Sequence, residues 1–415
     1  MKRPSAASLK RVTAENLARL GAGRLAEILV EVAGTRVELK RRLRMELAAE
    51  QGAEHLLPEI DRRLALVSTS RGAVSWRQRP ALARDLDGVR DLISTRLAAL
   101  DRPAAEDRIL GFLALAPQVA RRVRDKDGAV EAVFSRAAAD AVGLIAHAGH
   151  DALARLAEAI RAQPAAWGRW ADAFTDDHAG LAAILLQTAP DSAGPTWSSL
   201  LRRLADVVSD PDAYRATFTE EALRTPSIAA AVAARYLRAG RLDPARAVLQ
   251  SAVSPGLVRR TAGGVAPDPD WEGVWIDYLE ADDRPVEAQT ARWEAFTRTL
   301  SSDHARAYVK RLPDFEDVEA EERIFQTAAS HPDATAALSF LVAWPALREA
   351  AAVIMARSEE LRLDPERAEA WAARLAQRYP PAAERLLRRA SAEAFRRRDF
   401  KAASRLTEEA DAVAG

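Results

Sequence analysis

The chain has 415 residues, of which 48% are hydrophobic and 6% aromatic, and its 60 Lys and Arg residues balance 60 Asp and Glu residues. This composition excludes a disordered chain or a fibre, and the zero net charge excludes a whole-molecule attraction to nucleic acid or to an anionic membrane. Because the chain has no Cys, it has no disulfide, no thiolate nucleophile and no cysteine zinc site.

The residues that favour helices are abundant along the whole chain. There are 91 Ala residues, and Ala is the strongest helix former, whereas β-branched and aromatic residues are scarce. Thr35 and Glu38 have the spacing of a capping box, and Leu39, Leu43 and Leu47 follow on one face. We therefore expect an all-α fold. The predicted helices lie near residues 14–33, 36–49, 53–67, 80–100, 103–124, 129–147, 151–162, 165–174, 177–189, 195–208, 211–224, 226–239, 243–253, 271–282, 285–299, 302–312, 317–330, 332–343, 346–362, 365–378, 381–397 and 400–413.

Two stretches interrupt the helical pattern. Residues 190–195 and 254–270 concentrate Pro, Gly and Asp, and no apolar periodicity continues through them. We expect the second stretch to be a mobile loop that folding does not need. The predicted domains are a helical N-terminal domain over 1–189 and a helical-hairpin array over 190–415, with this loop at 254–270.

The predicted array repeats one plan. Residues 236–245 and 393–403 each read as a helix end, a short turn and a second helix that opens with small residues, and residues 278–288 follow the plan more loosely. An aromatic residue of the first helix that packs over a small residue of the second is typical of a tetratricopeptide hairpin. We therefore expect a tetratricopeptide-like α-solenoid in which Tyr236 and Phe395 are buried. The alternative is an irregular helical domain.

Several short segments spread over the chain resemble one family. They are residues 13–21, 24–31, 60–64, Trp76, 124–128, 379–383 and 400–403. These segments are similar to an uncharacterised bacterial all-α family, a domain of unknown function. The resemblance implies a helical N-terminal part joined to a tetratricopeptide-like C-terminal half. It implies no reaction.

Motifs for catalysis and cofactor binding are missing from the sequence. His147 and His150 have a spacing that could hold a metal, but Gly149 separates them and no further ligand series follows. Asp125 begins a stretch similar to a calcium loop, which lacks the required Glu because position 136 is Arg. Walker, nucleophile-elbow and dinucleotide-binding patterns do not occur. We therefore nominate no catalytic residue, cofactor or metal, and an enzyme is the less favoured interpretation.

The balanced total charge conceals an uneven distribution. Residues 1–130 carry 25 basic and 17 acidic residues, whereas 261–345 carry 7 basic and 17 acidic residues. Two basic clusters stand out, and the spacing of two Trp pairs places each pair on one helix face. For both pairs, Trp167 with Trp170 and Trp271 with Trp275, we favour core packing, and exposure in a binding groove is the alternative. The candidate partner-binding residues are Arg36, Lys40, Arg41, Arg44, Arg396, Arg397, Arg398, Trp271 and Trp275.

These observations favour a non-enzymatic interaction or scaffold protein that holds a peptide or protein partner in a groove of the helical array. We expect the Arg396–Arg398 cluster and the acidic stretch 314–322 to orient that partner. Two alternatives stay open: an enzyme of unknown reaction with a site between the two halves, and a nucleic-acid binder that uses the basic N-terminal part. No apolar leader or membrane segment is apparent, so we expect a cytoplasmic protein.

Overall fold

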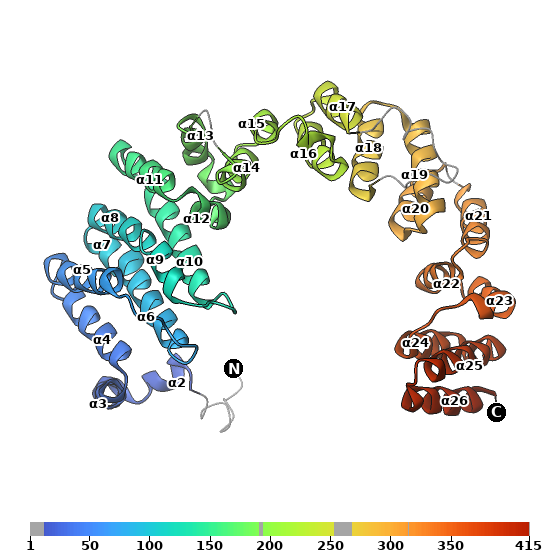
Figure 1. Ribbon diagram of the computed structural model, residues 1–415, viewed down its shortest axis with the longest axis horizontal. Coiled ribbons are helices and arrows are strands. Elements are labelled where there is room, and N and C mark those ends of the chain that lie inside the picture. The colour runs from blue at the N-terminus through green and yellow to red at the C-terminus, as the bar shows by residue number, and fades with distance from the viewer. Residues whose placement is uncertain (1–11, 191–193, 253–267, 314, 415) are drawn as a thin grey trace. The chain divides into compact units, whose positions relative to one another are not determined.

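A computed structural model describes residues 12–190, 194–252, 268–313 and 315–414. Contacts between helices divide the chain into an N-terminal unit, Met1–Thr219, and a C-terminal unit, Glu220–Gly415 (Figure 1). The sequence-based boundary at residues 189 and 190 stays a prediction. Most of the loop predicted at 254–270 lies outside the described residues, and its mobility is untested.

The described residues form helices and connecting turns, with one isolated parallel bridge between Val74 and Val123. The prediction of an all-α fold is therefore confirmed for these residues.

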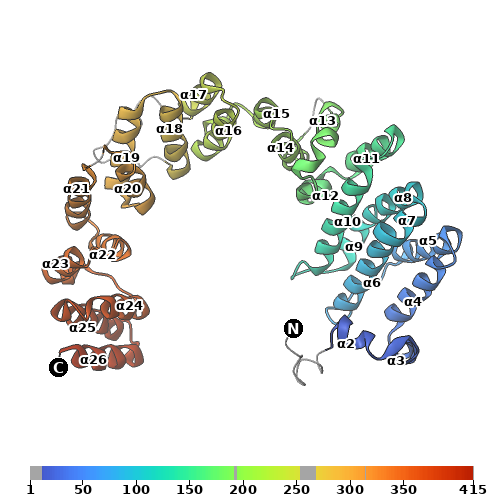
Figure 2. The same cartoon turned by 180° about the vertical axis from the view of Figure 1, so that it is seen from behind.

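The N-terminal unit consists of helices (Figure 2), and residues between Met45 and Val207 form its hydrophobic core. In chain order they are α2 (Ala14–Ala18), α3 (Gly21–Thr35), α4 (Val37–Ala49), α5 (Ala53–Thr69), α6 (Arg79–Leu92), the π-helical turn η1 (Ile93–Leu97), α7 (Ala98–Leu100), α8 (Arg102–Leu113), α9 (Ala116–Arg122), α10 (Ala129–Ile145), α11 (His150–Ala162), α12 (Pro164–Arg169), the short η2 (Ala171–Ala173) and η3 (Asp176–His178), α13 (Ala179–Gln187), α14 (Ser198–Val207) and α15 (Pro211–Ala216).

An aromatic cluster fills the middle of this core. The ring of Phe134 on α10 lies 5.2 Å from that of Phe112 and 6.2 Å from that of Trp170, measured between centroids. Trp170 also contacts Trp167 edge to face at 5.7 Å, and its indole N–H donates to Glu131 at 2.9 Å. Both Trp side chains are buried, in agreement with the interpretation of this pair as core residues. Large rings among many Ala residues supply the volume that dense packing requires.

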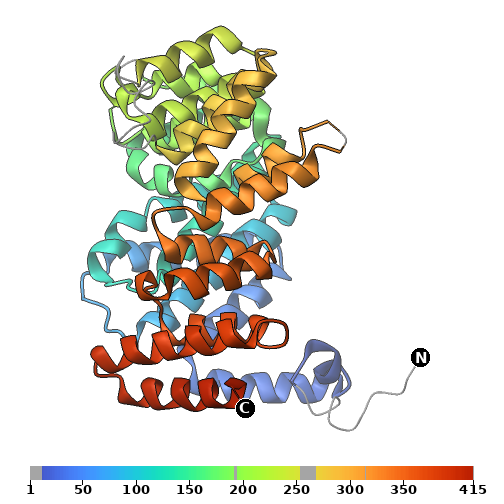
Figure 3. The same cartoon turned by 90° about the vertical axis from the view of Figure 1, so that its right-hand side faces the viewer.

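The C-terminal unit consists of helices that contact mainly the next or next-but-one helix along the chain. They are η4 (Ala222–Arg224), α16 (Pro226–Arg238), α17 (Leu242–Ser251), α18 (Pro269–Ala281), α19 (Pro285–Thr299), α20 (Ser302–Val309), α21 (Asp317–Ala329), α22 (Ala334–Ala343), α23 (Leu347–Arg357), η5 (Ser358–Glu360), α24 (Pro365–Leu375), α25 (Pro380–Arg396) and α26 (Phe400–Ala414). Figure 3 shows α25 and α26 side by side.

The three predicted helix–turn–helix segments close with the same turn. In each, an N–H group just past the first helix donates to a carbonyl five residues earlier, which satisfies an acceptor that the helix end leaves free. These bonds join Arg241 to Tyr236, Arg284 to Leu279 and Asp399 to Ala394, at 2.9, 2.9 and 3.0 Å. The residue before each donor has the left-handed backbone that this turn requires: Gly240, Asp283 and Arg398, with φ of 69°, 54° and 64°.

A polar network joins α18, α19 and the end of α20. The Glu280 carboxylate accepts hydrogen bonds from Arg311, and the buried Arg292 forms an ion pair with it. Burial opposes ionisation of this carboxyl, but the two guanidinium groups outweigh burial and hold the pKa of Glu280 below its ordinary value of 4.5.

Because the folded pKa is lowered, the stabilisation from Glu280 is present above pH 4.5 and is lost as the pH falls through the folded pKa. We expect Glu280→Gln to cost roughly 1 kcal/mol near neutral pH, and the difference from the parent to shrink in acid. Urea unfolding between neutral pH and about pH 3 measures this. The control is Glu319→Gln, on an exposed side chain without an ion pair among the described residues. A difference that is constant with pH would contradict the ion-pair origin.

Candidate functional site

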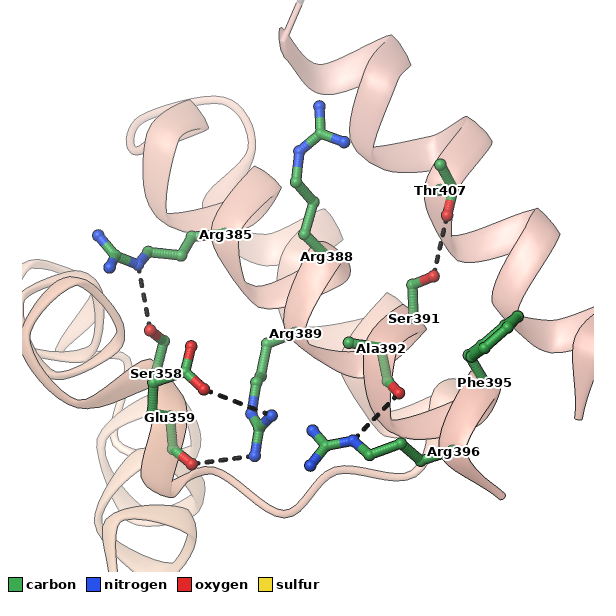
Figure 4. A pocket seen from close by; sticks show the side chains of 10 residues that line it. All are labelled: Ser358, Glu359, Arg385, Arg388, Arg389, Ser391, Ala392, Phe395, Arg396 and Thr407. Carbon is green, nitrogen blue, oxygen red and sulfur yellow. Dashed lines mark hydrogen bonds and ion pairs between the residues drawn. The ribbon is translucent and has the colours of Figure 1, made fainter. Parts of the chain in front are cut away.

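A groove with a volume of about 730 Å³ opens between η5, α25 and α26 (Figure 4). We call it the C-terminal groove. Its lining residues are Ser358, Glu359, Arg385, Arg388, Arg389, Ser391, Ala392, Phe395, Arg396 and Thr407. The lining thus contains four guanidinium groups, one carboxylate and one large aromatic ring.

Helix α25 supplies most of the groove because its two faces differ. Leu386, Leu387 and Ala390 are buried against neighbouring helices. Arg385 and Arg389 are four residues apart, and Arg396 follows seven residues after Arg389, so these side chains share the other face. Amphipathic packing of α25 therefore leaves a row of guanidinium groups along the groove.

Two of these guanidinium groups are held in place by η5. Arg389 donates through Nη2 to the Glu359 carbonyl at 2.9 Å, and its Nη1 lies 3.6 Å from the Glu359 carboxylate. The Arg389 Nε is buried and has no hydrogen-bond partner. Arg385 donates through Nε to the buried Ser358 hydroxyl at 3.1 Å (Figure 4). A ligand therefore meets guanidinium groups that are already oriented, which lowers the entropy cost of binding.

The cations of the groove are neutralised unequally. Arg388 pairs with Glu384 at 2.9 Å and with Asp411 at 3.1 Å, and Arg396 pairs with Glu393 at 3.4 Å. Arg385, by contrast, has no carboxylate partner in the described part of the chain. Positive charge is therefore available at the Arg385 end, where a planar guanidinium can bind a carboxylate in bidentate fashion.

Phe395 gives the groove an apolar wall, and the prediction that it is buried is wrong. Its side chain is 63% exposed and lies edge to face with the Phe400 ring, 5.4 Å away. The reason is a shift of one position: the turn bond to Asp399 starts from the Ala394 carbonyl, so Ala394 and not Phe395 takes the buried position, together with Ala403. Tyr236 has that position in the α16–α17 turn, where its carbonyl accepts from Arg241, and it is buried as predicted, together with Ala245.

The three residues of the Arg396–Arg398 cluster, at the end of α25, lie in different surroundings. Arg396 lines the groove, whereas Arg397 pairs with Glu393 at 3.1 Å and Arg398 occupies the left-handed position of the turn. Neither Arg397 nor Arg398 lines the groove. No ion pair joins this cluster to the described residues of the acidic stretch 314–322; Arg396 and Arg397 pair with Glu393 instead.

Trp271 is not a groove residue, which corrects its nomination. It is buried, and its indole N–H donates to the Leu249 carbonyl at 3.0 Å, so it packs α18 onto α17. Trp275 is half-buried and is stacked between Trp271 and Tyr278, at centroid distances of 5.6 and 5.2 Å. This Trp pair therefore belongs mainly to the packing of the C-terminal unit.

The basic cluster of α4 is also divided. Arg36, Lys40 and Arg44 are exposed and have no ion pair within the described ranges, but Arg41 binds the buried carboxylate of Asp85. Arg41 is therefore a structural cation rather than a free one. A second hollow of about 190 Å³ beside this helix is lined by three Arg side chains, among them Arg36, and by two carboxylates and apolar residues, so it is not a purely cationic site.

Sequence reasoning missed Arg385, Arg388, Arg389 and Phe395 as groove residues. The signal was present as Arg at positions i, i+4 and i+11 of one amphipathic helix. Across the described residues, no group of three or more His, Asp or Glu side chains is placed to hold a metal ion. Within the same residues, no helix combines the length and apolar character needed to cross a membrane.

The fold and the groove together define an all-α protein with a cationic surface groove. The chain belongs to DUF6880, a family of unknown function, whose model matches residues 7–176 and 187–415. The resemblance to an uncharacterised domain family is thereby confirmed. No curated protein matches the chain.

Proposed function

We propose that this protein is a non-enzymatic interaction module that holds an acidic segment of a partner protein in the C-terminal groove. The observation that carries the proposal is the row formed by Arg385, Arg388, Arg389 and Arg396, in which Arg385 has no carboxylate partner among the described residues and Glu359 is the one carboxylate of the lining. Arg and aromatic side chains dominate the binding energy of many protein interfaces, and both line this groove.

Ligand size and chemistry follow from the lining. A volume of about 730 Å³ accommodates a short peptide segment. Aspartate or glutamate side chains of that segment would bind the Nη groups of Arg385, which have no hydrogen-bond partner among the described residues, whereas both Nη groups of Arg389 contact Glu359 (Figure 4). An apolar side chain next to them would cover the exposed ring of Phe395. The preferred ligand is therefore an acidic peptide with an apolar anchor.

The architecture of the C-terminal unit supports a tetratricopeptide-like array as part of this proposal. Its helices contact mainly their neighbours along the chain, and the same closing turn recurs at Gly240, Asp283 and Arg398. Both features are expected of stacked helical hairpins, whose surfaces commonly bind peptides. A bacterial source and a cytoplasmic location stay predictions.

Peptide binding tests the proposal directly. We expect a labelled peptide rich in Asp and Glu, with one Phe, to raise its fluorescence anisotropy on addition of the full chain. A peptide of equal length with Lys in place of the acidic residues should not respond. Raising the salt concentration should weaken binding, since charged contacts that face solvent are screened.

The variants locate the binding site. We expect Arg385→Ser with Arg389→Ser to weaken binding at least tenfold, and Phe395→Ala to weaken it severalfold, with melting temperatures near that of the parent. Replacing Arg374 and Arg378, which are exposed on the same unit but do not line the groove, by Ser removes equal charge and serves as the control. Equal weakening by both pairs would show a general charge effect and reject the groove. If the double variant has a lower melting temperature than the parent, the binding affinity of the single variant Arg385→Ser is the test of the groove.

A further inference from the structure

Helix α3 carries an apolar stripe that the N-terminal unit leaves partly uncovered. Leu25, Ile28, Leu29 and Val32 have spacings of three and four residues and lie within an arc of about 100°. Leu29 and Val32 are 41% and 39% exposed, and Ala33 is the one residue of the helix that is buried. The main neighbours of α3 are α2 and α4 (Figures 1 and 2).

The two halves of α3 differ in side-chain size. The first half begins with Gly21, Ala22 and Gly23, whereas the bulky Leu29 and Val32 lie in the second half. Gly21 is four residues before Leu25 and lies on the same face, and no atom lies within 4 Å of the place where its Cβ would be. The stripe therefore has small residues at its N-terminal end and bulky residues at its C-terminal end. When a second copy lies antiparallel, the bulky end of each copy meets the small end of the other.

Charged residues beside the stripe also favour an antiparallel pair. Arg24 and Glu31 are seven residues apart and border the stripe on one side. In an antiparallel pair, Arg24 of each copy faces Glu31 of the other, whereas in a parallel pair Arg24 would face Leu29 of the other copy and meet no opposite charge. Both side chains are exposed, and among the described residues Arg24 forms an ion pair only with the exposed Glu27, at 2.8 Å.

We propose that α3 binds α3 of a second copy of this chain as an antiparallel, two-fold symmetric pair. Leu25 of one copy then packs beside Ile28 of the other, and Leu29 and Val32 cover the small residues Gly21 and Ala22. A two-fold interface uses the same patch on both copies, and the reciprocal Arg24–Glu31 contacts meet that requirement. This inference is independent of the C-terminal groove.

Sedimentation velocity of the full chain over a concentration series tests the pairing. We expect the mass to rise from 45.2 kDa toward twice that value as the concentration increases. Val32→Asp should raise the dimer dissociation constant at least tenfold. Val30→Asp is the matched control, because Val30 is 71% exposed but lies outside the stripe, and it should leave the constant unchanged. A monomer at about 100 µM, or equal effects of both variants, would overturn the proposal.

Charge exchange tests the antiparallel register. Arg24→Glu and Glu31→Arg should each weaken self-association, because each places like charges opposite one another twice. The double variant should regain it, and a mixture of the two single variants should form mixed dimers. If the single variants weaken association and neither the double variant nor the mixture restores it, the register is wrong.

Discussion

Trp170→Ala is expected to destabilise the N-terminal unit by about 3–5 kcal/mol, the usual cost of removing a fully buried aromatic side chain from a core. The ring contacts Phe134 and Trp167, and its N–H group donates to Glu131, so the variant loses packing and a hydrogen bond together. Urea unfolding of the full chain, with hydrogen exchange of peptides from α10 and α12, measures the loss and assigns it to this unit.

Two comparisons make this result specific. Trp170→Phe should retain most of the packing and lose less stability than the alanine variant. Trp76→Ala removes a ring that is 71% exposed, and surface changes of this kind alter stability by no more than about 0.5 kcal/mol. Equal losses for Trp76→Ala and Trp170→Ala would contradict the placement of Trp170 in the core.

Asp85→Ala is expected to cost about 3 kcal/mol. The buried Asp85 carboxylate on α6 accepts from Arg41 on α4 and from Arg63 on α5, so one side chain joins three helices. Burial, only partly offset by Asp85, lowers the pKa of the Arg63 guanidinium, and its Nε already has no hydrogen-bond partner. Removing the carboxylate leaves two cations close together in a poorly solvated place, which is strongly destabilising.

Asp91→Ala provides the control for this prediction. Asp91 pairs with Arg42 at 2.9 Å, but both side chains are well exposed, and such surface pairs contribute less than about 1 kcal/mol. In thermal and urea unfolding, Asp85→Ala should therefore lose clearly more stability than Asp91→Ala. Similar losses would mean that Asp85 behaves as an ordinary surface carboxylate.

The sequence predicted the helices well and their interruptions poorly. The helix predicted over 14–33 is divided at Gly21, where φ is 77°, and the helix predicted over 103–124 is divided between α8 and α9. Thr35 was expected to cap the next helix, yet it ends α3, and its hydroxyl donates to the Val32 carbonyl. Composition and periodicity determine that a segment is helical, whereas packing against neighbours decides where one helix stops and the next begins.

The candidate site was harder to predict because it depends on which face of a helix is covered. Phe395 was matched with Tyr236, but the hydrogen bonds of the two turns match Tyr236 with Ala394, and this difference of one residue leaves Phe395 exposed. The Arg396–Arg398 run attracted attention because its members are adjacent, although adjacent residues of a helix point in different directions. Spaced residues such as Arg385 and Arg389 make the groove, and their shared face becomes evident only once α25 is placed against η5 and α26.

The position of α26 at the end of the C-terminal unit has a kinetic consequence. Its main contacts are with α24 and α25, so its separation would leave the contacts among the other helices of that unit in place. Thr407 of α26 lines the groove, and its hydroxyl bonds to that of Ser391 on α25 at 2.9 Å. Separation of α26 from α25 would therefore dismantle the groove, and the residence time of the proposed ligand would depend on how firmly these two helices pack.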